Sequence, residues 1–479
     1  MKLTFLIPPP LDDKPPAERI FGCNYGIYHQ PNIFILYQTT LCQKNHHQVL
    51  IKDCVVEKLN KQALIQFLKK DAAEVYLFYT VYLSRKTDLL ARDLIKKVLP
   101  QALFIFSGTE PTTHPQDFVD KKSFVIRGET EETLIPLLTA IKTKCSFKKI
   151  KGISYLKGEK VIHNPSQPPV QNLDRLPFPN RELLPQNRNY YNPKLTKTPF
   201  TTILTSRGCS YRCSFCVPHS LDFAREIEFK NTFAKKPPVR LRSAGNVIKE
   251  FRQITREGYR AVSIIDDQFL WDKQRIIKIC EGIAPFKLEW SCLARANFLT
   301  DEALIRSLKK AGCAYIDLGV ESFDQRILDD IQKDILVEDF FRAVKLLKKY
   351  DIPVELNILI GSSPLETKET IELTVKKTIS LDPDYVLFSL CTPFPGTEFY
   401  QKAKAQGWMT TADYVPIDPM KETIISYPHL PKELMEKMLR ASYLKFYFRP
   451  AYLLKRVLKI KSPGDFINKI KTGFKLIRN

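Results

Sequence analysis

The chain has 479 residues, 44% of them hydrophobic, and a net charge of +22. This size and composition exclude a single small domain and general disorder. The eleven cysteines show no spacing typical of a disulfide scaffold, which indicates a reducing, cytoplasmic location. The start, MKLTFLIPPP, predicts no signal peptide, and no apolar run is long enough to span a membrane. The excess positive charge favours an anionic partner.

Strand-like and helical segments alternate over residues 1–150. The predicted strands are 2–7, 73–83 and 102–108, and the predicted helices are 60–70, 89–99 and 132–144. This alternation predicts a doubly wound, Rossmann-like α/β domain with a parallel sheet. Because ligands of such sheets lie beyond the carboxyl ends of the strands, we expect ligand loops at 107–115 and 127–134.

A second series of strand–helix units follows a proline-rich linker at residues 151–198. Its predicted strands are 200–206, 261–267, 287–295, 315–322, 353–361 and 384–396. Six units are too few for a closed eight-fold barrel, so residues 199–415 are predicted to form a partial (β/α)6 barrel similar to the TIM barrel. Residues 416–479 are predicted to be a helical, basic C-terminal extension.

Three cysteines follow the first predicted barrel strand. Cys209, Cys213 and Cys216 have the spacing C-x3-C-x2-C. An iron–sulfur cluster normally takes four thiolates. Three cysteines therefore leave one iron with an open coordination position, as in a catalytic metal site. A Cys3His zinc site with His219 as the fourth ligand is the alternative.

This motif, at the first strand of a partial (β/α)6 barrel, resembles the signature of the radical S-adenosylmethionine (radical SAM) superfamily. The resemblance implies that Cys209, Cys213 and Cys216 bind three irons of a [4Fe-4S] cluster and that S-adenosylmethionine (SAM) chelates the fourth. An electron from a flavodoxin-like or ferredoxin-like donor would then cleave SAM to methionine and a 5′-deoxyadenosyl radical. That radical abstracts hydrogen from the substrate.

The resemblance also implies SAM contacts next to the cysteines and at the second strand. Phe215, directly before the last cysteine, matches the position of an apolar residue beside the adenine. Asp266 and Asp267 end the second barrel strand, where the superfamily binds the SAM amino group, often through a Gly-Gly-Glu motif. This chain has no Gly-Gly-Glu motif, so the group that receives the amine stays open.

Later strand ends supply the remaining expected SAM contacts. Arg295 follows the third strand and is expected to pair with the SAM carboxylate. Glu321 and Ser322 end the fourth strand and suit ribose or ammonium contacts. Gly361 lies in the segment NILIGSSPLET, which resembles the family's GLPGET stretch, so its backbone is expected to approach the adenine or ribose.

The first 150 residues resemble the cobalamin-binding domain that precedes the barrel in one branch of this superfamily. The matching stretches are SGTEPTTHP and GETEETL. The expected cobalamin contacts in these stretches are Gly108, Thr109, Thr112, Gly128 and Glu129. The chain departs from the branch at Ser107, Glu110 and Thr130, and it lacks an Asp-x-His-x-x-Gly motif. A bound cobalamin is therefore expected to have no protein histidine below its cobalt; the alternative is a domain that only shapes the substrate cavity.

We therefore expect a cobalamin-dependent radical SAM enzyme that methylates an unactivated carbon. One SAM would methylate cobalamin and a second would yield the radical. Oxidative cyclisation or carbon–carbon coupling is the alternative within the same branch. RNA methylthiotransferase-like chemistry is another, in which Cys23, Cys42 and Cys54 would hold a second cluster. A non-catalytic binding protein that kept the fold is a third alternative.

The C-terminal sequence bears on partners. From Lys445 to Asn479 there are ten Lys or Arg residues and one acidic residue, interleaved with apolar side chains. This pattern suits a helix docked on the barrel or an interfacial segment on a membrane, and no sequence-specific nucleic-acid motif is visible. We expect a small-molecule or lipid substrate, no nucleic-acid partner, and a cytoplasmic protein for which peripheral membrane contact is the alternative.

Overall fold

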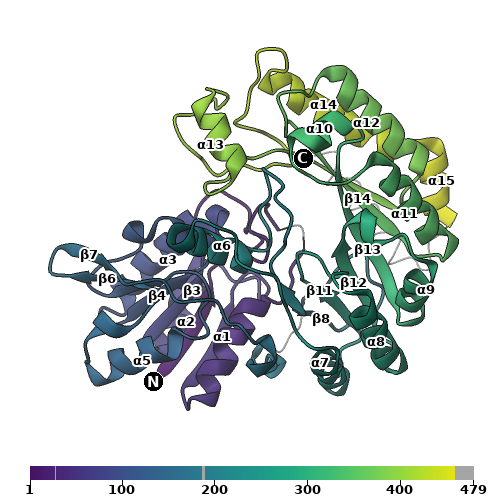
Figure 1. Ribbon diagram of the computed structural model, residues 1–479. Coiled ribbons are helices and arrows are strands. Elements are labelled where there is room, and N and C mark those ends of the chain that lie inside the picture. Colours follow the sequence, from purple (N-terminus) through teal and green to yellow (C-terminus); the bar gives the residue numbers. More distant parts are fainter. Residues whose placement is uncertain (27, 186–188, 459–479) are drawn as a thin grey trace. The chain divides into compact units, whose positions relative to one another are not determined.

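The computed structural model describes residues 1–26, 28–185 and 189–458 (Figure 1). These residues form two compact units. Unit 1 contains residues 1–210, 217–293 and 306–314, and unit 2 contains residues 211–216, 294–305 and the described residues from 315 on. The N-terminal sheet and the first barrel strands thus belong to the same unit.

The N-terminal half of the chain forms a seven-stranded sheet with the order β2-β1-β3-β4-β5-β6-β7. The strands are β1 (Lys2–Ile7), β2 (Gln48–Asp53), β3 (Val75–Tyr79), β4 (Leu103–Ser107), β5 (Ser123–Ile126), β6 (Ile153–Lys157) and β7 (Lys160–His163). Strands β1 to β5 are parallel, which confirms the Rossmann-like prediction. Strands β6 and β7 form an antiparallel hairpin at the sheet edge, so the sheet is mixed rather than wholly parallel.

Helices connect the strands of this sheet (purple to blue in Figure 1). They are α1 (Ile33–Lys44), α2 (Lys61–Asp71), α3 (Arg85–Val98), α4 (Thr109–Thr113) and α5 (Leu134–Thr143). The sequence did not predict α1, because its side chains are buried on most sides and leave no polar stripe. The helix begins at Asn32, whose side chain accepts hydrogen bonds from the amides of Phe34 and Ile35.

The second half contributes a six-stranded sheet with the order β15-β14-β13-β12-β11-β8. Its strands are β8 (Phe200–Ile203), β11 (Ala261–Ile264), β12 (Glu289–Ala294), β13 (Cys313–Glu321), β14 (Val354–Ile360) and β15 (Tyr385–Leu390). Within unit 1, β8, β11 and β12 pair in parallel, and within unit 2, β13, β14 and β15 do the same. The six predicted strands and the partial-barrel fold are confirmed.

Helices and one small ladder complete the second half. The helices are α6 (Ser220–Phe233), α7 (Ala244–Arg256), α8 (Lys273–Ile283), α9 (Glu302–Lys310), α10 (Gln325–Asp330), α11 (Val337–Lys349), α12 (Lys368–Leu381) and α13 (Glu398–Ala405). The ladder joins β9 (Ser206–Arg207) to β10 (Arg240–Leu241). The sequence did not predict α6, because this helix buries charged residues such as Arg225 and Glu228, which hide its period.

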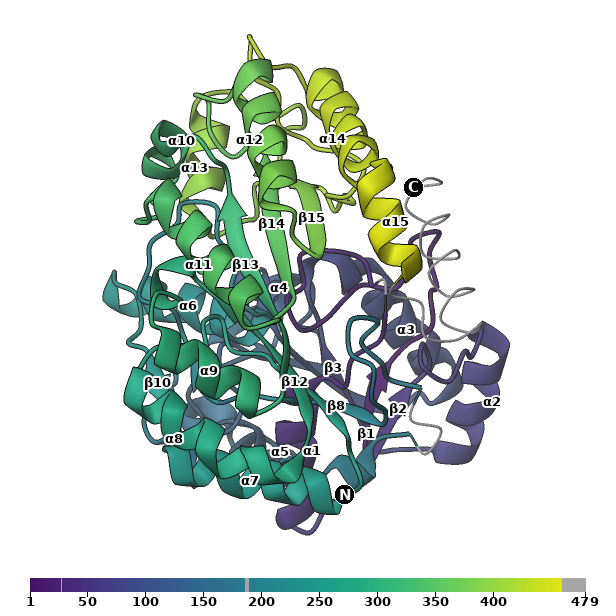
Figure 2. The ribbon, with the colours of Figure 1, turned by 90° about the vertical axis from the view of Figure 1, so that its right-hand side faces the viewer.

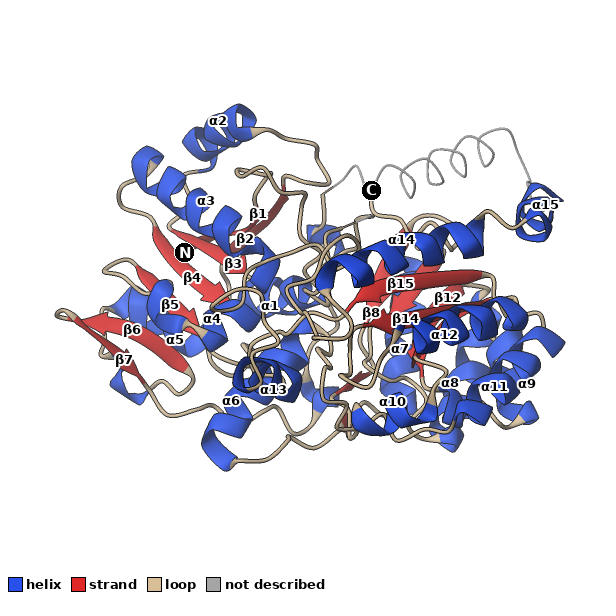
Figure 3. Cartoon of the chain, turned by 90° about the horizontal axis from the view of Figure 1, so that it is seen from above, coloured by secondary structure: helices blue, strands red, loops and turns tan. Residues whose placement is uncertain are grey.

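The C-terminal extension begins with α14 (Lys432–Tyr447) and α15 (Pro450–Leu458). In Figures 2 and 3, α14 lies along β15 and beside α12. The Tyr443 hydroxyl donates to the Phe388 carbonyl of β15 at 2.7 Å, and Phe446 is fully buried. Helix α14 thus packs on the barrel, although it lies mostly before the range Lys445 to Asn479 for which docking was predicted. The predicted basic tail beyond 458 lies outside the described residues, and none of the described helices is long and apolar enough to cross a bilayer.

Candidate active site

Three thiols follow β8 and β9. Cys209, Cys213 and Cys216 are partly exposed. Gly208, directly before them, has a φ of +96°, a conformation that favours glycine, and it turns the chain into the cysteine segment. Three accessible cysteines within eight residues fit the donor set of an iron–sulfur cluster with one open iron.

The backbone of the segment 211–216 bonds other parts of unit 2. The Ser214 amide donates to the Ile331 carbonyl at 3.0 Å, and the Ser214 carbonyl accepts from the Phe399 amide at 2.9 Å. The Cys216 amide donates to the Cys213 carbonyl at 3.1 Å. Phe215, the expected adenine contact, is partly exposed in this segment.

Arg295, at the end of β12, is the cation nearest to a described cysteine of unit 2. Its guanidinium carbon lies 3.4 Å from the centre of the Tyr211 ring, and Nη1 lies 3.9 Å from Cys213 Sγ. Nη2 donates to the carbonyls of Lys333 and Asp334. The buried Nε has no protein partner. This remaining donor fits the predicted pairing of Arg295 with a carboxylate ligand.

The sequence did not single out Lys333. Its ammonium group is buried and lies 2.7 Å from Glu321 Oε1. Burial alone would lower the pKa of Lys333, but the Glu321 carboxylate outweighs it and raises the pKa. Gly319 makes the pair possible, because a Cβ there would lie 2.9 Å from Lys333 Nζ. Lys333 follows a short helix in a turn without periodicity, so only its charge could have suggested it.

Glu321 has an unusual backbone. Its φ is +66°, and the pairing of β13 with β14 shifts register between Gly319 and Glu321. Non-glycine residues in this region are strained, and such strain is common at functional sites. The neighbouring Ser322 is buried, and its hydroxyl lies 3.3 Å from that of Thr374. Glu321 thus forms an ion pair with Lys333, and Ser322 forms a hydrogen bond with Thr374.

Gly361 lies in a tight turn after β14. Its φ is +82°, and a Cβ would lie 2.7 Å from Met435 Sδ of α14. The Gly361 amide donates to Glu366 at 2.7 Å, and its carbonyl accepts from the Tyr427 hydroxyl at 3.1 Å. Burial raises the pKa of Glu366 to about 7. Glycine is required here for its conformation and for the close packing of α14.

Residues 205–208, which we call the approach segment, precede Cys209 in unit 1. Asp266, at the end of β11, accepts from the Thr205 amide at 2.6 Å and from the hydroxyls of Thr205 and Ser206. The Gly208 amide donates to Asp222 Oδ2 of α6 at 2.6 Å. Both oxygens of Asp266 are used by the chain itself. Of the two candidate aspartates, Asp266 therefore serves to hold the approach segment.

Asp267 differs from its neighbour. Its Oδ1 accepts from the His219 amide at 2.7 Å, whereas the buried Oδ2 lacks a donor. Burial and the nearby Asp222 carboxylate raise the pKa of Asp267 well above its usual range. A raised pKa favours the protonated carboxyl, which does not suit an ammonium group, so the group that receives the SAM amine stays open.

His219 does not fit a fourth zinc ligand. Its Nδ1 accepts from the Asp222 amide at 3.1 Å, and Nε2 lies 2.7 Å from Asp222 Oδ2. Ligand atoms about 2 Å from a tetrahedral zinc lie about 3.3 Å apart, so the shorter separation indicates direct pairing of the ring with Asp222 rather than two ligands of one zinc. Both ring nitrogens thus serve α6 and Asp222. The same distance argues against a metal held by His219, Asp222 and Asp267.

The expected cobalamin loops lie at the carboxyl ends of β4 and β5. Thr112 Oγ1 donates to the Gly108 carbonyl at 2.7 Å and accepts from the Gly128 amide at 3.1 Å. The fully buried hydroxyls of Thr80 and Thr109 have no partner among the described residues. Buried hydroxyls rarely stay unpaired without a ligand or water, so they fit a polar ligand at this sheet edge.

Two other predicted groups behave differently. The carboxylate oxygens of Glu129 pair with Arg207 and Arg240. Burial raises the pKa of the Cys23 and Cys54 thiols to about 12, and that of Cys42 is raised as well.

Residues 203–378 match the radical SAM superfamily. The chain is 29% identical to a Pyrococcus horikoshii protein described as an uncharacterized methyltransferase, over 96% of this chain and 95% of that protein. It is 24% identical to the anaerobic magnesium-protoporphyrin IX monomethyl ester cyclase of Cereibacter sphaeroides, over 78% of this chain and 59% of the cyclase.

Among solved structures, the cobalamin-dependent S-adenosylmethionine radical enzyme OxsB is similar with a TM-score of 0.69 and 16% identity. The match covers 99% of this chain and 70% of OxsB, which was solved with aqua-cobalamin and S-adenosylmethionine bound. This likeness confirms the order of the two α/β parts. Together with the three thiols after β8 and Arg295 after β12, the family match identifies residues 203–378 as a radical SAM domain, and the chain as an enzyme that uses a [4Fe-4S] cluster and SAM.

Proposed function

We propose that this enzyme transfers a methyl group to an unactivated carbon with the help of cobalamin. The observation that carries the proposal is the Rossmann-like sheet ahead of the barrel, with unpaired buried hydroxyls at its carboxyl edge. The relative from Pyrococcus horikoshii, similar over nearly the whole chain, is described as a methyltransferase. Cobalamin, when bound, supplies a methyl carrier, and the cluster with SAM supplies a radical.

The loops of the sheet fit cobalamin without a histidine below cobalt. His114 is the histidine of these loops, and its Nδ1 lies 3.4 Å from Glu110 Oε1. That hydrogen bond raises the pKa of His114, which favours the imidazolium over the neutral ring that coordinates metals. Thr80 and Thr109 are the residues that would donate to the corrin side chains.

The residues of unit 2 would position SAM. Arg295 would use its free Nε for the SAM carboxylate, while Lys333 pairs with Glu321. The turn at Gly361 would support the adenosine. Arg295 Nε is a donor without a partner among the described residues, and the buried Lys333–Glu321 pair fixes charge in a low dielectric.

The decisive experiment is cobalt per chain after anaerobic reconstitution with iron, sulfide and hydroxocobalamin, followed by transfer of labelled methyl from SAM. We expect a ratio near one, lowered by Thr80→Val combined with Thr109→Val. Thr139→Val, in the exposed part of α5, is the matched control. A ratio near zero with an intact cluster would contradict the proposal.

Oxidative cyclisation is the second candidate, because the chain resembles the magnesium-protoporphyrin cyclase over 78% of its length. The two reactions differ in the fate of SAM. A methyltransferase yields S-adenosylhomocysteine and 5′-deoxyadenosine together, whereas a cyclase yields 5′-deoxyadenosine without the methyl-transfer product. Product analysis with labelled SAM therefore separates them.

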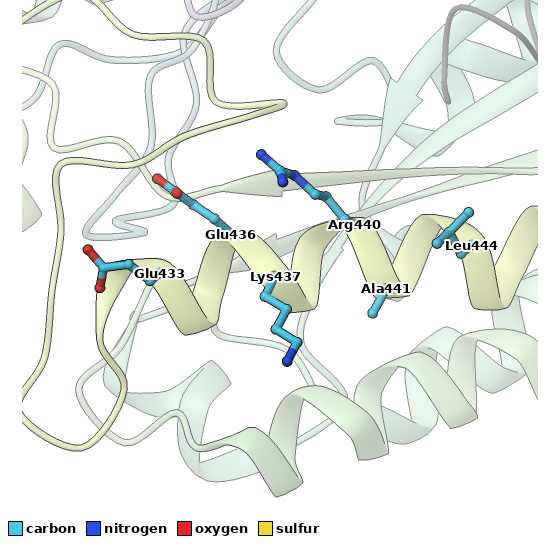
Figure 4. Close-up of a pocket in the computed structure, with 6 residues that line it drawn as sticks. All are labelled: Glu433, Glu436, Lys437, Arg440, Ala441 and Leu444. Atoms are coloured by element: carbon cyan, nitrogen blue, oxygen red, sulfur yellow. The ribbon is translucent and has the colours of Figure 1, made fainter. Parts of the chain in front are cut away.

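An anionic lipid surface is the partner we propose for the C-terminal helices. Leu444, Phe448, Leu453 and Leu454 expose 53%, 48%, 46% and 62% of their surfaces. A shallow groove on α14, lined by Glu433, Glu436, Lys437, Arg440, Ala441 and Leu444, runs along the same helix (Figure 4). Acidic side chains lie at its start and cations follow toward the basic tail, a pattern that suits interfacial binding. A lipid substrate and a flavodoxin-like or ferredoxin-like donor complete the proposed partners.

Sedimentation with vesicles tests this surface. We expect the protein to pellet with phosphatidylcholine vesicles containing phosphatidylglycerol, less so in high salt, and not with phosphatidylcholine alone. The triple variant Phe448→Gln/Leu453→Gln/Leu454→Gln should lose binding. The control Leu336→Gln/Leu365→Gln, at exposed leucines elsewhere in unit 2, should keep it. Equal binding by both variants would contradict the proposal.

A further inference from the structure

Arg207, in the approach segment, is a fully buried cation next to the cysteine motif. Its Nη2 bonds Glu131, and its Nη1 lies 3.3 Å from Glu129 Oε2. Its guanidinium carbon lies 5.6 Å from the centre of the Tyr37 ring. Both glutamates belong to the loop after β5. A loop of the N-terminal sheet therefore holds a residue two positions before Cys209.

Glu129 has no oxygen left for a ligand. Oε1 bonds Arg240 and lies 4.0 Å from Arg225 Nε, and Oε2 accepts from the Val170 amide at 2.7 Å. Burial by itself raises the pKa of Glu129, but Arg207 and Arg240 outweigh it and lower the pKa to about 2. The carboxylate is thus ionised and saturated by the chain.

The rest of the approach segment shows the same pattern. Asp266 holds Thr205 and Ser206, and Asp222 holds the Gly208 amide. Each residue from 205 to 208 is thus bound by a carboxylate from outside the segment. Three different places supply these groups: the end of β11, helix α6 and the loop after β5.

We propose that Glu129 and Glu131 are positioning residues that act through Arg207 to set the place of Cys209, and that Glu129 is not a cobalamin contact. Partners behind a metal ligand orient it and tune the metal. The loop after β5 would thereby contribute to the cluster's geometry and to the coordination of SAM. The proposal rests on the cluster and is independent of cobalamin binding.

A second ion pair offers a matched comparison. Arg127 precedes the same loop, and its Nε donates to Glu228 of α6 at 3.1 Å. The two side chains are 8% exposed, so they are buried much as Arg207 is. This pair contributes to the same packing but contacts no residue of the approach segment. A purely structural role for the loop would make both pairs equivalent.

The test uses full-length, anaerobically reconstituted protein with Arg207→Lys and Glu129→Gln, and Arg127→Lys as the control. The readouts are the EPR spectrum of the reduced cluster with and without SAM, SAM affinity, hydroxocobalamin affinity and unfolding temperature. We expect all variants to lose stability. Arg207→Lys and Glu129→Gln should also alter the EPR spectrum and weaken SAM binding about 10-fold or more, whereas Arg127→Lys keeps both.

Hydroxocobalamin affinity should stay within about 3-fold of the parent in Glu129→Gln, well below the usual effect of removing a ligand contact. Loss of hydroxocobalamin binding with an unchanged EPR spectrum would overturn the proposal and make Glu129 a cofactor contact. An unchanged spectrum and unchanged SAM affinity in both test variants would also overturn it. Arg207→Lys keeps the buried charge, so it remains informative if Glu129→Gln does not fold.

Discussion

The two stretches on either side of Cys209 are held by different means. The approach segment is fixed by buried carboxylates that bind its amides, hydroxyls and one guanidinium. The segment 211–216 is held by backbone hydrogen bonds to Ile331 and Phe399 and by contacts of Tyr211 with Arg295 and Asn297. Backbone bonds tolerate side-chain change, whereas a buried carboxylate demands a specific donor. The difference indicates that residues before Cys209 fix the position of the chain, whereas residues after it mainly supply the thiols.

Removing a thiol tests the second stretch most strongly. Cys216→Ala should abolish cluster assembly and SAM cleavage, since two thiolates cannot hold a [4Fe-4S] cluster. The free energy of unfolding should change by about 1 kcal/mol or less, because the backbone bonds of the segment remain. Iron analysis and denaturant unfolding measure the two effects. Cys145→Ala, at an exposed cysteine, should leave both unchanged.

Removing a carboxylate tests the approach segment. Asp266→Ala strands three buried donors, so we expect a loss of about 3 kcal/mol in unfolding free energy. Asp272→Ala removes only the N-cap of α8, where Asp272 accepts from the Arg275 amide at 2.8 Å, and should cost about 1 kcal/mol. Urea unfolding compares them. Equal losses of unfolding free energy in the two variants would show that Asp266 acts as an ordinary helix-cap carboxylate does. The contrast between the approach segment and the segment 211–216 would then be wrong.

Arg295→Lys probes a cation that joins the cysteine segment to its surroundings. Lysine cannot both stack on Tyr211 and donate to two carbonyls while leaving a donor for a carboxylate. SAM affinity should fall about 10-fold, with cluster content retained. Arg212→Lys, at an exposed arginine of the same segment, is the control. A SAM titration followed by EPR gives the result, and equal affinities would remove Arg295 from the site.

The smallest expected effect concerns pH. The pKa of Glu366 is about 7 in the fold and 4.5 as the reference value. Its protonation therefore stabilises the fold fully below pH 4.5, and this contribution is lost as the pH rises through 7. Relative to Glu366→Gln, a permanently neutral analogue, the parent should lose about 1 to 3 kcal/mol between pH 5 and pH 8. Thermal unfolding at several pH values measures this difference, and a pH-independent difference would contradict it.

The sequence predicted what depends on spacing and periodicity. The six barrel strands, β1, β3 and β4, and the cysteine motif all carry a local signal. Helix α6 carried none, because Arg225 and Glu228 are buried through ion pairs with Glu129 and Arg127, which lie far along the chain. The hairpin of β6 and β7 was hidden by short strands next to a proline-rich stretch.

The candidate site was predicted unevenly for the same reason. Arg295 and Glu321 follow strands, so their place was visible from the pattern. Lys333 lies in an irregular turn, and its role depends on a partner that only the fold supplies. The distinction between Asp266 and Asp267 depends on which oxygen is already bonded, and neighbouring residues of the same type give no sequence signal for that.

The packing of Met435 against Gly361 limits how this enzyme can be divided. Three contacts support the turn after β14. The Tyr427 hydroxyl donates to the Gly361 carbonyl, and His429 Nε2 lies 2.9 Å from the Glu366 carbonyl. Met435 fills the space that a side chain at Gly361 would occupy. All three come from residues after the last barrel strand. A chimera with a relative therefore has to take residues 427–435 and the barrel from the same protein. A junction at residue 416 would separate the turn after β14 from the residues that contact it.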